Sequence, residues 1–131
     1  MPRRLKSVRY KLTAERAAGR AARRQEMYDT AAFLAEQAAQ LFIKHKILEL
    51  TGEMPRIHTI RQLIAVLAEC TGGRWREELT EFAKRRRSLL IRLEEAYISS
   101  RYLFRRYDRD EAEELVGFAR EVIELVGRVQ E

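Results

Sequence analysis

The segment Tyr97-Ile98-Ser99-Ser100-Arg101-Tyr102 places hydroxyl groups around one guanidinium at what we predict to be a helix end. An arginine can hold a phosphate with two parallel N–H donors, and neighbouring tyrosines can stack or hydrogen-bond. Two more arginines and a tyrosine follow within six residues and add positive potential and another ring. We therefore predict a nucleotide- or phosphate-binding site that consists of Arg101, Tyr102, Arg105, Arg106 and Tyr107.

A structural role for Arg101 stays open beside the binding role. Its guanidinium can pair with a carboxylate such as Glu94 or Glu95, or with one from the second predicted helix. Such a pair would lock the junction between the last two helices.

The histidines do not supply catalysis in an obvious way. RNA cleavage without a metal needs a general acid or base beside a cation that stabilises the phosphorane charge. His45 and His58 are the only histidines, and no arginine stands five to seven residues before either. They and Cys70 also lack the spacing of metal ligands. The sequence thus predicts no catalytic residue, no metal site and no cofactor.

Three further residues are candidates for a groove or an interface. Gln37 interrupts an alanine-rich stretch, where a polar group needs a partner, which could be a symmetry-related copy, a backbone carbonyl or a ligand. His58 opens the third predicted helix, where capping or packing competes with a groove or interface role. Ser100 precedes Arg101 directly.

Positive charge is concentrated at the N-terminal end. Residues 1–30 hold nine Lys or Arg and three acids, a balance of 9 − 3 = +6, and the remaining residues balance at 17 of each sign. Any attraction for phosphate is therefore expected mainly in the first helix and its leader. The alternative is a solvated, arginine-rich helix face.

Helical periodicity extends through nearly the whole chain, and no strand pattern competes with it. The sequence predicts an all-α fold, an up-and-down antiparallel bundle of four to five helices in a single domain over residues 1–131, with a basic leader at about 1–12. The helices are expected at about 13–26, 29–50, 58–68 and 75–97, with a last helix capped by Asp108 and Glu111. Gly52 is expected to end the second of them.

The second predicted helix is apolar on more than one face. Phe33, Leu34, Leu41 and Leu48 widen its apolar surface beyond the alanine stripe. A helix of this kind lies at the centre of a bundle or meets another subunit.

Composition restricts the cellular compartments in which the protein is expected. One cysteine excludes an intramolecular disulfide, and no run approaches the roughly 18 apolar residues of a membrane span. A cytoplasmic location is expected. The absence of asparagine and the 35% of charged residues resemble proteins from hot environments.

Three segments together carry a resemblance to a known family. Residues Ala31–Gln40, Pro55–Ile60 and Tyr97–Tyr102, in this order within a five-helix layout, resemble the HEPN domain, the higher-eukaryote and prokaryote nucleotide-binding helical bundle. The resemblance covers about residues 12 to 129. It implies a homodimer, often encoded beside a minimal nucleotidyltransferase, with some relatives acting as metal-independent ribonucleases.

The chain departs from the ribonuclease members at one point. In those relatives a histidine follows the arginine by four to six residues, whereas no histidine stands between Arg101 and Asp108. The resemblance therefore implies a non-catalytic module that binds a nucleotide, RNA or a nucleotidyltransferase partner, in a toxin–antitoxin-like system. The alternatives are a divergent ribonuclease toxin that uses Arg101 with Tyr107 or His58, and a purely structural dimerisation module.

Overall fold

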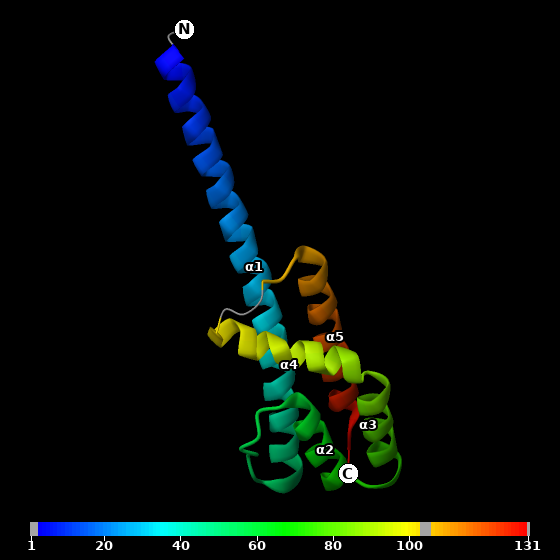
Figure 1. Cartoon of the computed structure of the whole chain (residues 1–131). Coiled ribbons are helices and arrows are strands. Elements are labelled where there is room, and N and C mark those ends of the chain that lie inside the picture. The colour runs from blue at the N-terminus through cyan, green and yellow to red at the C-terminus, as the bar shows by residue number, and fades with distance from the viewer. Residues whose placement is uncertain (1–2, 103–105, 131) are drawn as a thin grey trace.

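A computed structural model describes residues 3–102 and 106–130, with side chains for 8–100 and 106–130. This part of the chain forms five helices and no strand: α1 (Arg3–Thr51), α2 (Ile60–Cys70), α3 (Gly73–Arg85), α4 (Arg87–Tyr102) and α5 (Arg109–Arg128). Figure 1 shows α2, α3, α4 and α5 grouped around the C-terminal half of α1. The predicted all-α helical bundle is confirmed.

Helix α1 is longer than the sequence analysis predicted. The two helices expected at 13–26 and 29–50 are one continuous helix of 49 residues, because no glycine or proline interrupts the chain between them. Its end is where we expected it. Gly52 adopts a φ of 79°, and its N–H donates to the carbonyl oxygen of Leu48 at 2.8 Å. A residue with a side chain would be strained in this left-handed conformation.

The single helix expected at 75–97 is divided at Arg86. The guanidinium of Arg86 donates to Glu121 of α5 at 2.7 Å and lies 5.2 Å from the ring centre of Phe118. Backbone angles at Arg86 leave the helical region, and α4 then takes a new direction across α1, as Figure 1 shows. The break is a tertiary effect, since the sequence around Arg86 holds neither glycine nor proline.

The core lies where the C-terminal half of α1 packs against α2, α4 and α5. Its large fully buried side chains are aliphatic except for Glu36, and the aliphatic ones come from every helix: Ile43, Ile60, Leu63, Ile64, Leu67, Leu79, Leu90, Leu93, Leu115, Val122 and Val126. Burial of these side chains supplies the main driving force for folding.

Helix α5 begins with the predicted capping box. The carboxylate of Asp108 accepts the Glu111 N–H at 2.7 Å, and the Glu111 carboxylate accepts the Asp108 N–H at 3.4 Å. This cap fixes the point where the chain enters α5, directly after the residues predicted to bind phosphate.

Candidate functional site

The connection between α4 and α5 is fastened to α1. The backbone N–H of Tyr107 donates to Asp29 at 2.8 Å, and the side-chain amide of Gln25 donates to the Tyr107 carbonyl oxygen at 2.7 Å. Gln25 also donates to Asp29 at 3.0 Å. Two side chains of α1 thus hold both backbone polar groups of Tyr107, and they place the end of α4 beside the middle of α1.

A pocket of about 350 Å³ lies between α1 and α4 beside this connection. Its lining includes carboxylates, hydroxyls and two aromatic residues, and the lining residues are Glu26, Asp29, Thr30, Phe33, Ala96, Ser99, Ser100 and Tyr107. Helical spacing explains the set, because Glu26, Thr30 and Phe33 occupy successive turns on one side of α1. Lysine, arginine and histidine are absent from these described lining residues.

Of the five predicted phosphate-binding residues, Tyr107 lines the pocket, and several of the others lie outside the described part of the structure. Arg101 and Tyr102 belong to the last turn of α4, directly after the pocket residue Ser100, and their side chains are outside the described residues. Arg105 is wholly outside them. Arg106 is exposed, and Tyr107 is buried with its side chain against the pocket.

Glu94, one of the carboxylates considered as a partner for Arg101, has another partner in the structure. Glu94 is taken by Arg61 of α2, whose guanidinium contacts both carboxylate oxygens at 2.9 to 3.1 Å. Glu94 also accepts the backbone N–H of Arg61 at 2.9 Å. Because Thr59 makes no side-chain cap, this carboxylate of α4 caps the first turn of α2.

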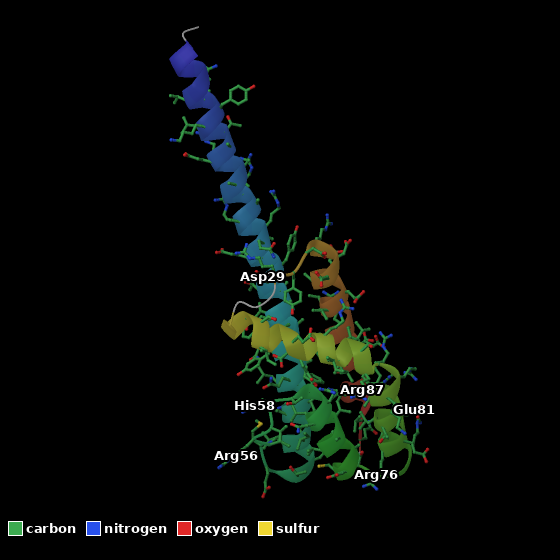
Figure 2. The ribbon with its side chains drawn as sticks, viewed as in Figure 1. Asp29, Arg56, His58, Arg76, Glu81 and Arg87 are labelled. Carbon is green, nitrogen blue, oxygen red and sulfur yellow. The ribbon has the colours of Figure 1, made fainter. Side chains whose placement is uncertain are left out.

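Of the three groove or interface candidates Ser100, Gln37 and His58, only Ser100 lines the pocket. Ser100 faces the pocket and donates to the Tyr97 carbonyl oxygen at 2.8 Å. Gln37 donates to Glu36 at 2.6 Å, a partner that the sequence did not suggest. His58 is exposed in the α1–α2 connection, and Figure 2 shows it on the opposite side of α4 from Asp29.

A row of buried polar side chains runs along α1 toward His58. Gln40 donates to Glu36 at 2.7 Å, the ammonium of Lys44 donates to Gln40 at 2.9 Å, and Lys44 Nζ lies 3.0 Å from His58 Nδ1. Glu36 is 1% exposed and Lys44 is 9% exposed. The ammonium of Lys44 can only donate, so His58 Nδ1 accepts the hydrogen bond and the ring N–H of His58 lies on Nε2, facing away from Lys44.

Burial raises the pKa of the Glu36 carboxyl above its ordinary value of 4.5. Hydrogen bonds from Gln37 and Gln40 lower it again in part, and the neighbouring Glu94 raises it while Lys44 lowers it. The folded protein therefore binds more protons than the unfolded chain as the pH rises above 4.5. Stability from this group is fully present below the unfolded pKa and is lost as the pH rises through the folded pKa.

Replacing Glu36 with glutamine should therefore stabilise the protein at neutral pH. The amide has nearly the same shape and carries no charge to desolvate. Its oxygen can accept from Gln40, and the half-buried Gln37 can turn its own amide oxygen toward the new N–H group, so the advantage over the wild type should grow as the pH rises from 4 to 8. Urea unfolding across this range measures the difference, with the exposed Glu124→Gln as control. If the free energies of unfolding of Glu36→Gln and the wild type change in parallel with pH, the pKa of Glu36 is not raised by folding.

Sequence reasoning missed this polar row. Glu36, Gln40 and Lys44 are four residues apart and lie on the side of α1 that also carries Ala32, Ala39 and Ile43. Polar residues repeating every four positions within an apolar stripe were the available signal. Lys44 is buried although the next residue, His45, is exposed and contacts Glu49 at 3.1 Å.

Neither a metal centre nor a membrane-spanning helix is present among the described residues. None of their His, Cys, Asp and Glu side chains gather in a group of three or more that could hold a metal ion. Among the described helices, none is both long and apolar enough to cross a membrane.

The fold defines the class of this protein as an all-α helical bundle. Residues 12–129 match the HEPN domain family. The chain therefore belongs to the HEPN domain family, and is a nucleotide- or RNA-related module. No curated protein and no solved structure gave a significant match.

Proposed function

We propose that this protein is a non-catalytic HEPN-type module that forms a homodimer and binds a nucleotide or RNA in the pocket between α1 and α4. The observation that carries the proposal is the pocket itself, whose lining residue Ser100 directly precedes Arg101 in α4 and which has no histidine among its described lining residues. A minimal nucleotidyltransferase is the partner protein we propose, within a toxin–antitoxin-like system.

The pocket offers the chemistry that a nucleoside needs. Carboxylates of Glu26 and Asp29 and the hydroxyl of Thr30 can accept hydrogen bonds from ribose hydroxyls or from exocyclic amino groups of a base. Phe33 supplies an aromatic wall for stacking. Carboxylates repel phosphate, so the phosphate would need cations from outside this lining, and Arg101 and Arg106 directly follow and precede the lining residues Ser100 and Tyr107 in the chain.

Obstructing the pocket should weaken nucleotide binding. Thr30 lines the pocket from an exposed position on α1, so Thr30→Trp should fill the opening without disturbing the core. Isothermal titration with AMP is expected to show at least about tenfold weaker binding, which corresponds to roughly 1.4 kcal/mol. The matched control is Thr80→Trp at an exposed threonine of α3, which should bind as the wild type does. Equal affinity for both variants would refute the pocket as the binding site.

The dimer surface that we propose is the exposed side of α1 within the bundle. Met27, Leu34 and Leu41 follow one another at intervals of seven residues and are 66%, 56% and 60% exposed. Ala38, also exposed, lies between the two leucines. This stripe lies on the side of α1 opposite the buried Ile43, so a second copy can cover it without changing the core.

Charge favours an antiparallel pairing of the two α1 helices. Four arginines, at positions 9, 16, 20 and 23, continue the same side of the helix toward its N-terminus. A parallel dimer would bring both sets face to face, whereas antiparallel packing centred between Leu34 and Leu41 separates them. Residues before about position 23 would then extend past the end of the partner helix, because α1 rises about 1.5 Å per residue.

A further inference from the structure

The N-terminal part of α1 extends from the bundle as a single helix, which Figure 1 shows in blue. From residue 8 to residue 24 every side chain is exposed, and only Gly19 is half-covered. An isolated helix gains nothing from packing, and conformational entropy opposes its formation. The length of this exposed helical arm therefore indicates that it binds a partner outside the bundle.

The arm carries an aligned row of positive charge, which we call the arginine stripe: Arg9, Arg16, Arg20 and Arg23. Residues that are four or seven apart lie on the same side of an α-helix, so the four side chains form one line about 21 Å long. In the described part of the chain none of the four guanidinium groups has an ion-pair partner. Glu15 is the single acid between residues 8 and 24.

The stripe borders a shallow hollow at Gly19. The absence of a side chain there leaves a depression that Leu12, Glu15, Arg16, Arg20 and Arg23 surround. The guanidinium of Arg23 lies close above Gly19, 3.7 Å from where a Cβ would stand. A helix backbone that can be approached at this point, with three guanidinium groups around it, suits a ligand with closely spaced anionic groups.

We propose that the arginine stripe binds along the phosphate backbone of double-stranded RNA, as a surface separate from the pocket. The choice of RNA rests on the proposed function. Base pairing fixes the phosphates of a duplex in position, so a rigid line of four cations loses little entropy in meeting them. An α-helix does not fit the deep, narrow major groove of A-form RNA, and contacts then fall on phosphates and 2′-hydroxyls. Binding is therefore expected to be independent of base sequence.

Salt dependence of binding by the full-length protein tests the stripe. Four phosphate contacts per arm should give a slope of log K against log salt of about −3.6, and Arg16→Gln with Arg20→Gln should reduce it to about −1.8. At 0.1 M salt the double variant should bind a duplex RNA at least about tenfold more weakly. The control, Lys11→Gln with Arg120→Gln, removes the same charge from exposed positions off the stripe and should keep the wild-type slope.

Separate ligands distinguish this inference from the proposed function. The stripe variant should bind AMP normally, since the pocket is intact, and circular dichroism should show its helices intact. Unchanged duplex affinity and slope in the stripe variant would overturn the inference, even if AMP binding stands. Tighter binding to single-stranded RNA or to a DNA duplex than to an RNA duplex would overturn the assignment to duplex RNA. Normal duplex binding by a protein that binds no AMP would instead refute the pocket alone.

Discussion

Replacing Arg101 with alanine should weaken the binding of AMP about 30- to 150-fold, because a charge-assisted bidentate contact contributes roughly 2–3 kcal/mol. Arg101 stands in the last turn of α4, directly after the pocket residue Ser100. Arg101 is also the single cationic residue of the motif at 97–102. Isothermal titration of the two proteins measures the change, and Arg101→Lys should recover part of the affinity, since lysine keeps the charge and loses the fork.

The same variant separates the two roles of Arg101. If the guanidinium instead pairs with a carboxylate and locks the junction of α4 and α5, Arg101→Ala should lower the free energy of unfolding and leave the affinity of the folded protein unchanged. Arg120→Ala, at an exposed position on α5, controls for the loss of one positive charge. Wild-type affinity in Arg101→Ala would remove Arg101 from the binding site.

A second large effect is expected at the exposed leucines of α1, which form the proposed dimer surface. Leu34→Glu combined with Leu41→Glu should convert the dimer to a monomer, because an isologous interface contains each leucine twice. Leu34 and Leu41 are each somewhat over half exposed, so covering all four copies stabilises the dimer by about 3–7 kcal/mol, at roughly 1.5–3 kcal/mol for each fully buried leucine. Four carboxylates would then lie within the interface. Sedimentation equilibrium measures the mass, and circular dichroism should show an unchanged helix content.

A matched control uses exposed apolar residues that lie elsewhere. Met54 and Ile98 are 53% and 49% exposed and belong to the α1–α2 connection and to α4. Met54→Glu with Ile98→Glu adds the same charge and should leave the dimer intact. A wild-type protein that sediments as a monomer at every concentration would contradict the proposed interface. So would a Leu34→Glu, Leu41→Glu variant that stays dimeric.

Local signals in the sequence predicted the fold well. Periodicity gave an all-α bundle, Gly52 marked the end of α1, and Asp108 with Glu111 marked the start of α5. The errors came from tertiary causes. The break at Arg86 depends on Glu121 and Phe118, which lie more than thirty residues further along the chain. The predicted boundary between residues 26 and 29 had no breaker to support it, and α1 continues through it.

The candidate site was only partly accessible from the sequence. The motif at 97–102 pointed to the end of α4, and the pocket lies beside it. The wall of the pocket that α1 forms could not be predicted, because Glu26 and Asp29 come close to α4 only when α1 and α4 pack together. Tyr107 was chosen for its ring, yet its backbone groups are the ones that Asp29 and Gln25 hold. The row from Glu36 to Lys44 was hidden for the same reason, since its burial depends on the packing of α1 against other helices.

Incubation of the purified protein with a labelled RNA that has single- and double-stranded parts, in the presence of EDTA, tests most directly whether the protein binds without cutting. Binding is read by mobility shift and cleavage by denaturing gel on the same samples. We expect a shifted complex that depends on Arg101 and an RNA of unchanged length. Cleavage by the wild type that disappears in Arg101→Ala would contradict the non-catalytic function and establish a ribonuclease.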